Sequence, residues 1–200
     1  MKVFEAIEAR RSVKHYDTEA VMTDAEFEQL MQAVLLSPTS FNTQNWRFLR
    51  ITDSDQRAKV CEVAWGQAQV TDACEVLLLC ADLKAWEKSP ERYWRNADET
   101  IQSILLPMID DFYRGKEQTQ RDEAMRSCGI AAQTIMLASK AMGYDTCPMI
   151  GFDAEAMAEL INLPEDHVIG LMVAIGKAKE PAKPRGGQLP LEEVLKENAF

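Results

Sequence analysis

Residues 74–81, Cys74-Glu75-Val76-Leu77-Leu78-Leu79-Cys80-Ala81, form a nearly continuous apolar run. A run of this kind is typical of a β-strand that is buried on both faces. Residues 168–176, Val168-Ile169-Gly170-Leu171-Met172-Val173-Ala174-Ile175-Gly176, have the same character and predict a second buried strand. Residues 46–51, with their aromatic and aliphatic side chains, predict a further strand. These runs are the strands that we expect at the centre of the fold.

Helices are expected around these strands. The clearest spans residues 121–142, where apolar side chains are interleaved with alanines, and it ends at Gly143 in the C′ position. Because small residues let another helix approach closely, this helix is a candidate for a central or dimer-interface position. Thr23 and Glu26 have the spacing of a capping box and predict a second helix, which ends before Ser37-Pro38. Shorter helices are predicted over residues 4–9, 53–64 and 154–161.

Length and composition predict one domain over residues 1–200, with a helical insertion at about 82–120 and a C-terminal tail at 177–200. The chain is 46% hydrophobic and 27% charged, which is the composition of a globular protein. Its formal net charge is −10, from 22 basic and 32 acidic residues. A nucleic-acid or anionic-membrane binder would carry the opposite excess, so neither is expected as a partner. Basic residues that cluster in such an acidic chain indicate instead that the ligand is one small anion.

The cysteines and histidines indicate a reduced protein without a metal site. The five cysteines are odd in number, contain no Cys-x-x-Cys pair and lie mostly in apolar runs, as expected of buried thiols in a cytoplasmic protein. The two histidines, His15 and His167, are far apart in sequence, so a metal site is not expected. The sequence has no apolar stretch of signal-peptide or membrane-span character.

The segment Ala9-Arg10-Arg11-Ser12-Val13-Lys14-His15-Tyr16-Asp17 is a candidate phosphate site. If it is extended, alternate side chains share a face, so Arg10, Ser12 and Lys14 point the same way. Two cations with a hydroxyl between them suit a phosphate, because Arg offers a planar fork of donors and Lys a compact charge. The alternative is a solvated basic patch at the end of the preceding helix, where the helix dipole favours cations.

Two further segments have candidate binding roles. Seven of the nine residues from Ser37 to Asn45 carry uncharged hydrogen-bonding side chains, which suit the edge of a polar heterocycle or an ordinary polar turn. Gly151 would let a ligand approach the backbone, or serve in a simple turn. The aromatic residues of the 82–120 insertion would cover a pocket or pack one side of an amphipathic helix. The tail is rich in proline and has no regular structure, apart from a short amphipathic piece at 189–195.

Four segments together resemble the nitroreductase family of flavin enzymes, in the same order along the chain. These are Arg-Arg-Ser-Val-Lys at 10–14, Ser-Pro-Thr-Ser-Phe-Asn-Thr-Gln-Asn-Trp-Arg-Phe at 37–48, Gly-Tyr-Asp-Thr-Cys-Pro-Met-Ile-Gly-Phe-Asp at 143–153, and Ile-Gly-Lys-Ala at 175–178. The resemblance implies an α+β fold, with a mainly antiparallel central sheet surrounded by helices. It also implies an intertwined homodimer that binds FMN in two sites at its interface.

The resemblance assigns the candidate site residues. It places Arg10, Arg11, Ser12 and Lys14 on the phosphate, ribityl and pyrimidine side of FMN. The residues that would face the flavin ring from the other subunit are Pro38, Thr39, Ser40, Asn42 and Gln44. The residues that would lie along or touch the isoalloxazine and ribityl groups are Gln69, Pro148, Met149, Ile150 and Gly151. Lys183 and Arg185 would close on the phosphate from the tail, and the candidate substrate-pocket residues are Phe41, Phe112 and Tyr113.

The implied activity is a ping-pong oxidoreductase that uses NADH or NADPH as the reductant. A hydride would pass to N5 of FMN, and a nitroaromatic, quinone or similar small electron acceptor would then take the electrons. No protein side chain is expected to act as a catalytic acid or nucleophile, because the flavin carries the chemistry. The alternatives are a flavin enzyme of the same fold that performs dehalogenation or ring fragmentation, and a non-catalytic flavin-binding dimer.

Overall fold

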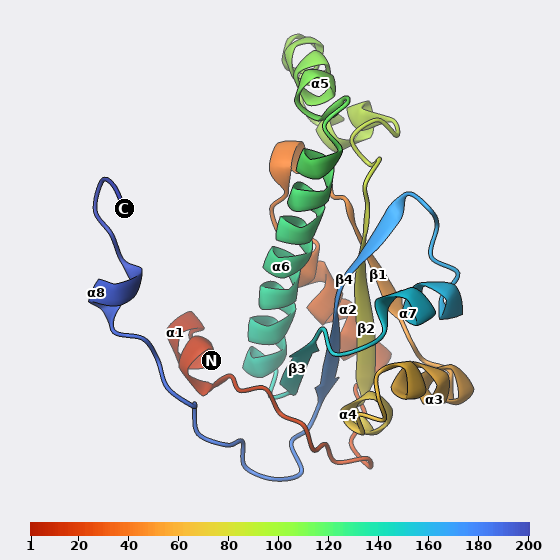
Figure 1. Ribbon diagram of the computed structural model, residues 1–200, viewed down its shortest axis with the longest axis vertical. Coiled ribbons are helices and arrows are strands. Elements are labelled where there is room, and N and C mark those ends of the chain that lie inside the picture. Colours follow the sequence, from red (N-terminus) through yellow and green to blue (C-terminus); the bar gives the residue numbers. More distant parts are fainter.

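A four-stranded antiparallel sheet with strand order β1-β2-β4-β3 lies at the centre of the protein, in a computed structural model that describes residues 1–200 (Figure 1). The strands are β1 (Trp46–Arg50), β2 (Glu75–Asp82), β3 (Asp145–Met149) and β4 (His167–Gly176). The helices are α1 (Val3–Ala9), α2 (Asp24–Val34), α3 (Ser54–Val63), α4 (Gln69–Asp72), α5 (Glu99–Tyr113), α6 (Glu117–Ala141), α7 (Ala154–Leu160) and α8 (Leu191–Val194). Two short 3₁₀ helices, η1 (Ser40–Asn42) and η2 (Pro90–Trp94), complete the set.

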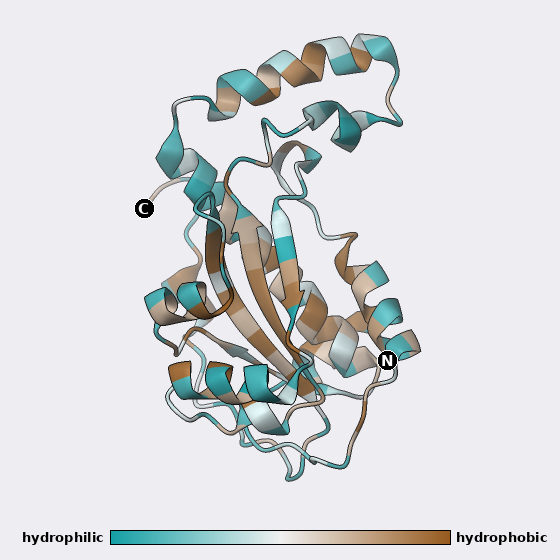
Figure 2. Cartoon of the chain, turned by 90° about the vertical axis from the view of Figure 1, so that its right-hand side faces the viewer, coloured by the Kyte–Doolittle hydropathy of each residue, from teal (hydrophilic) through white to brown (hydrophobic).

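Helices cover both faces of this sheet. All eight residues of β2 are buried, as the apolar run predicted, and successive side chains point to opposite faces. Leu78 packs with Val60 of α3 in one core cluster, whereas Leu79 packs with Ile135 of α6 in the other. Figure 2 shows the sheet as a hydrophobic layer between helices whose outer surfaces are polar. The result is an α+β fold of three layers with two main hydrophobic cores, one on each face of the sheet.

The long helix α6 spans one face of the sheet. The prediction for residues 121–142 is confirmed, although the helix begins earlier, at Glu117. Gly143 follows the helix with φ +82°, the left-handed conformation expected at C′. The capping box at α2 is also confirmed, because Glu26 N–H donates to Thr23 Oγ1 and Thr23 N–H donates to the Glu26 carboxylate.

Three sequence-based expectations differ from the structure. β3, which the sequence did not predict, forms a strand by pairing with β4, and it tolerates Pro148 because it lies at the edge of the sheet. The prediction that β4 is buried holds only from Met172 to Gly176, and the first half of the strand is half-buried. The amphipathic piece at 189–195 forms the short helix α8, but α8 lies away from the body of the chain and Leu191 and Val194 remain exposed (Figure 1).

The insertion between β2 and α6 is helical, as predicted, and contains η2 and α5. Its buried aromatic residues Trp86 and Tyr113 pack with Ile109 in a small third core. This result supports the amphipathic-packing interpretation for these two side chains. Phe112 remains more open, with 37% of its surface exposed. None of the helices combines the length and apolar character needed to cross a membrane.

The segment from Ser12 to Asp17 is fixed by backbone pairing to both β3 and the chain that leaves β4. Val13 N–H donates to the carbonyl of Thr146 at 3.0 Å. Further along, Lys179 N–H donates to His15 O and Asp17 N–H donates to Lys177 O, both at 2.9 Å. The two ends of the chain are therefore held side by side.

Tyr16 anchors this segment in the core. Its ring is buried, and its hydroxyl donates to the carbonyl of Ala174 at 3.2 Å. The ring lies directly against the backbone of Gly176, where an added Cβ would be 2.8 Å from Tyr16 Cδ1. Only glycine leaves room for the tyrosine ring at this position.

We predict that Gly176→Ala destabilises the protein by about 1–3 kcal/mol, the usual cost of overpacking a core. In a Tyr16→Ala background the same substitution should cost less, because the ring that it meets is gone. Urea denaturation of the wild type, both single variants and the double variant measures this coupling. Equal costs of Gly176→Ala in the two backgrounds would contradict the proposed contact.

Candidate functional site

Cationic side chains from the two ends of the chain line a groove beside β3. The groove consists of two adjoining cavities of about 290 and 310 Å³, which share Ser12 and Lys183. Together they fall in the size range of small-molecule sites. Six of the predicted site residues line them: Arg10, Arg11, Ser12, Lys14, Lys183 and Arg185. The predicted meeting of the N-terminal basic segment with the tail is therefore present in a single chain.

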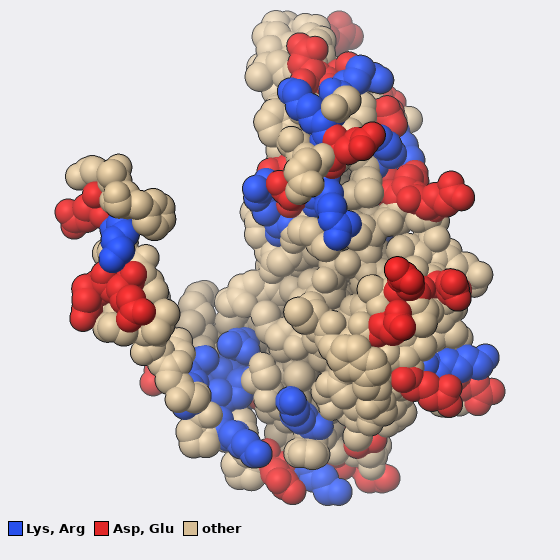
Figure 3. All heavy atoms as spheres, viewed as in Figure 1, with Lys and Arg blue, Asp and Glu red and all other residues tan.

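The charges in this groove are not neutralised within the chain. None of the five cations forms an ion pair, and Glu180, which lines the smaller cavity, forms none either. Burial and the nearby charges of Arg185 and Arg11 lower the pKa of Arg10. Figure 3 shows basic atoms gathered between the tail and the body of the molecule. An anion bound here would relieve the repulsion among these cations.

Two of the arginines also satisfy the C-terminal end of α1. Arg11 Nη1 donates to the carbonyls of Glu8 and Arg10. Arg185 Nη2 donates to the carbonyls of Ile7 at 3.0 Å, Glu8 at 3.4 Å and Arg10 at 3.2 Å. The alternative interpretation, a basic patch at a helix end, thus describes part of what these two side chains do. Lys14 and Lys183 make no such contact and remain open to a ligand.

The second group of predicted residues, 148–151 and Gln69, lies along the same edge of the sheet, at β3. Segment 10–14 pairs with β3, and Lys14 is close enough to Cys147 to oppose the rise in pKa that burial causes in that thiol. Gly151 lies just beyond β3, beside the exposed side chain of Ile150. Gln69 is buried and donates to Gln67 Oε1 at 3.0 Å.

Gln67 adjoins the predicted site residues but was not among them. Its Nε2 donates to the carbonyl of Gly151 at 2.7 Å, so it joins Gln69 to the β3 edge. A Cβ at position 151 would lie 3.2 Å from this nitrogen and 3.4 Å from Trp65, which explains the glycine. The only signal in the sequence was two glutamines that are two residues apart, and that spacing is too common to identify a network.

The polar loop from Pro38 to Gln44 does not reach this groove within one chain. It lies against η2 instead: Asn42 Nδ2 donates to the Tyr93 carbonyl at 2.8 Å, and Trp94 Nε1 donates to the Phe41 carbonyl at 3.0 Å. Phe41, Asn42 and Gln44 all have positive φ, between 42° and 54°. Such backbone strain in non-glycine residues is concentrated at functional sites. The five residues of this loop assigned to the flavin ring are thus separate from the cationic groove.

The predicted substrate-pocket residues adjoin this loop. The rings of Phe41 and Phe112 have centroids 5.3 Å apart, and those of Phe41 and Tyr113 are 6.2 Å apart. Tyr113 is buried behind them, and burial raises the pKa of its hydroxyl. The three side chains therefore form one aromatic cluster, of which Phe41 and Phe112 are the accessible members.

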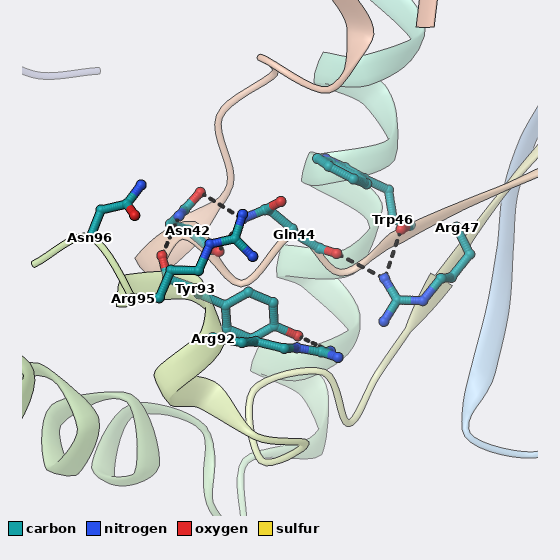
Figure 4. A pocket seen from close by; sticks show the side chains of 8 residues that line it. All are labelled: Asn42, Gln44, Trp46, Arg47, Arg92, Tyr93, Arg95 and Asn96. Atoms are coloured by element: carbon teal, nitrogen blue, oxygen red, sulfur yellow. Dashed lines mark hydrogen bonds between the residues drawn. The ribbon is translucent and has the colours of Figure 1, made fainter. Parts of the chain in front are cut away.

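A larger cavity of about 470 Å³ opens on the other side of the same loop (Figure 4). Asn42, Gln44, Trp46 and Arg47 line it from the loop and β1, and Arg92, Tyr93, Arg95 and Asn96 line it from η2 and the residues after it. Asn42 and Gln44 are among the predicted site residues, whereas the three arginines are not. The spacing of Arg92 and Arg95 was visible, but it gave no reason to place them beside a loop some 50 residues earlier.

One cluster of acidic and histidine side chains has the proximity of metal ligands: Asp82, Asp166 and His167. The ammonium of Lys88 occupies its centre, at 2.9 Å from Asp82 Oδ2 and 2.6 Å from Asp166 Oδ2. Hydrogen bonds from Lys88 and His167 lower the pKa of Asp166 to about 2. The negative charges of the two carboxylates are thus balanced by Lys88, and Arg47 forms a further ion pair with Asp82.

Comparison with known proteins identifies the family. The family model described as "Nitroreductase family" matches residues 7–177 of this chain. Protein DrgA of Synechocystis sp. is 52% identical over 98% of this chain and 95% of its own length. The chain belongs to the nitroreductase family. A candidate NAD(P)H nitroreductase of Bacillus subtilis, YodC, is 34% identical over 95% of this chain and 96% of its own.

Solved structures of nitroreductases share the fold. The candidate nitroreductase YdfN of Bacillus subtilis has a TM-score of 0.91 at 30% identity, covering 96% of this chain and 97% of its own. A candidate nitroreductase of Exiguobacterium sibiricum, solved in complex with FMN, has a TM-score of 0.91 at 27% identity and covers 98% of this chain and 97% of its own. The predicted α+β nitroreductase fold is therefore confirmed.

The contacts of Arg185 in this nitroreductase predict that it holds the tail against α1. Arg185→Ala removes the donors to the carbonyls at the end of α1, so the tail should move more freely. Hydrogen–deuterium exchange in a peptide covering residues 4–11 should become faster. Lys183→Ala is the matched control, because Lys183 makes none of these bonds. Unchanged exchange in the Arg185 variant would show that the tail is held by other contacts.

Proposed function

We propose that this nitroreductase binds FMN with its phosphate in the cationic groove. The observation that carries the proposal is the convergence of five unpaired cations from both ends of an acidic chain. A phosphate dianion would supply the missing negative charge and accept charge-assisted hydrogen bonds from Arg10 and Arg11. The FMN complex of the Exiguobacterium relative supports the choice of ligand.

The donors along the β3 edge fit the remainder of the flavin. The backbone N–H of Gly151 donates to no acceptor within the chain. Gln69 is fixed by Gln67 and offers an amide to the ribityl or ring oxygens. Lys14 lines the cavity that adjoins the one lined by Arg10, Arg11 and Arg185, and its ammonium would favour added electrons on a ring bound beside it.

We propose that the active protein is a homodimer in which the second subunit completes the site. The loop at 38–44 carries strain but lies away from the groove of its own chain, so a partner must bring it to the flavin. Large apolar side chains are exposed in the isolated chain, including Phe4 at 84% and Leu36 at 83%, as expected of an interface. The apolar side of α8 has no partner in its own chain either.

The proposed activity is the transfer of reducing equivalents from NADH or NADPH to a small acceptor such as a nitroaromatic compound or a quinone. When bound, FMN supplies a ring that accepts a hydride at N5 and returns electrons to the acceptor. The chain binds and orients that ring, and reductant and acceptor would occupy the same space in turn, which gives ping-pong kinetics. Relatives are named both as NADPH nitroreductases and as an NADH dehydrogenase, so their names do not fix the reductant. We place the enzyme in the cytoplasm.

The first test is whether the purified protein carries or takes up FMN and whether NADH or NADPH bleaches its absorbance. Arg10→Ala should weaken FMN binding by about tenfold to a hundredfold, because it removes a charge-assisted hydrogen bond worth roughly 1.5–3 kcal/mol. Lys59→Ala is the control, since Lys59 is exposed, forms no ion pair and lies on α3. Titration followed by flavin fluorescence measures both affinities.

Each outcome of this test has a definite meaning. Uptake with bleaching supports the proposed enzyme, whereas uptake without bleaching by either reductant indicates a flavin-binding dimer without this activity. Failure to bind added FMN would refute the proposal. An Arg10 variant that binds FMN as tightly as the Lys59 control would remove Arg10 from the phosphate site.

A further inference from the structure

The cavity in Figure 4 is lined by arginines that the flavin site does not use. Arg92 and Arg95 come from η2 and its C-terminal end, and both are exposed. Neither forms an ion pair, although the chain as a whole is strongly acidic. The cavity is therefore a second cationic site, separate in the chain from the groove beside β3.

Arg92 is held in position by its neighbours. Its guanidinium carbon lies 4.7 Å from the centroid of the Tyr93 ring, and Nη2 contacts the Tyr93 hydroxyl at 2.6 Å. That hydroxyl donates in turn to the carbonyl of Ala85 at 3.1 Å. A stacked guanidinium with open N–H groups is arranged to bind an anion at little further entropic cost.

Arg95 and Arg47 differ in the partners they already have. Arg47 donates to the carbonyls of Gln44 and Trp46 and pairs with Asp82 at 3.2 Å, so its charge is compensated. Arg95 makes no side-chain hydrogen bond, and Figure 4 shows its guanidinium reaching toward Asn42 and Gln44. Arg95 and Arg92 are thus the two cations that remain available to a ligand.

We infer that this cavity binds the 2′-phosphate of NADPH and makes the enzyme prefer NADPH over NADH. The inference rests on the proposed function, in which Asn42 and Gln44 face the flavin ring of the partner subunit. A dinucleotide whose nicotinamide stacks on that ring would pass these amides and run outward along the cavity toward Arg92 and Arg95. Arginine is the usual partner of a 2′-phosphate, because its planar donors match phosphate oxygens.

The charge of the site favours a phosphate monoester over a neutral or singly charged group. A phosphate monoester carries nearly two negative charges at neutral pH, which two uncompensated guanidinium groups can balance. Asn96, whose side chain is exposed at the rim of the same cavity, adds an amide for the sugar hydroxyls. NADH lacks the monoester, so it would lose most of the interaction with the two arginines.

A binding experiment on the FMN-loaded protein tests the inference without turnover. Isothermal titration with adenosine 2′,5′-bisphosphate and with adenosine 5′-monophosphate compares ligands that differ by the 2′-phosphate. The wild type should bind the bisphosphate at least about tenfold more tightly, and Arg95→Ala should reduce that ratio to near one. Lys59→Ala, on a remote helix, should leave the ratio unchanged.

Reduction kinetics provide the second arm. In Arg92→Ala and Arg95→Ala, the second-order rate constant for flavin bleaching by NADPH should fall by about tenfold to a hundredfold, with less than about a threefold change for NADH. An equal fall for both reductants, or no fall for either, would overturn the inference. So would a shift of the Arg95 variant from dimer to monomer on sedimentation, since the cavity would then be a contact between subunits. As a control, the flavin absorbance of each variant must match that of the wild type. If the wild-type protein itself shows no flavin absorbance after FMN is added, the proposed function is refuted, and not this inference alone.

Discussion

Backbone pairing of residues 12–17 is the constraint on which the candidate site depends. One hydrogen bond attaches Val13 to the edge strand β3, and two more attach His15 and Asp17 to the chain leaving β4. Because the same short segment contacts both, the N-terminal cations and the proline-rich tail must meet at one edge of the sheet. Tyr16 fixes this arrangement by inserting its ring over Gly176, where no other residue leaves enough space.

The arrangement concentrates positive charge in a protein whose net charge is −10. Burial, followed by the nearby charges of Arg185 and Arg11, lowers the pKa of Arg10, while Arg11 and Arg185 donate hydrogen bonds to carbonyls at the end of α1. A bound phosphate would relieve the repulsion among these cations. Acidic surfaces elsewhere would meanwhile discourage large polyanions, so the charge pattern selects for a small ligand.

The sequence was sufficient for the features that depend on local pattern, and insufficient for those that depend on tertiary contacts. The apolar run of β2, the capping box at Thr23 and the end of α6 at Gly143 follow from periodicity and backbone preference, and all are present. β3 escaped prediction because its pairing with β4, not its own residues, makes it a strand. The role of Gln67 likewise depends on a contact with a residue 84 positions away. The family resemblance, rather than residue pattern, supplied the assignment of the 38–44 loop.

The relative affinity of the apoprotein for FMN and for riboflavin tests the central claim most directly, because the two ligands differ only by the phosphate. If the groove beside β3 holds that phosphate, several charge-assisted hydrogen bonds should make FMN bind at least about a hundredfold more tightly than riboflavin. The advantage should shrink as salt concentration rises, since the groove is partly exposed. Equal affinities for the two flavins would contradict the account.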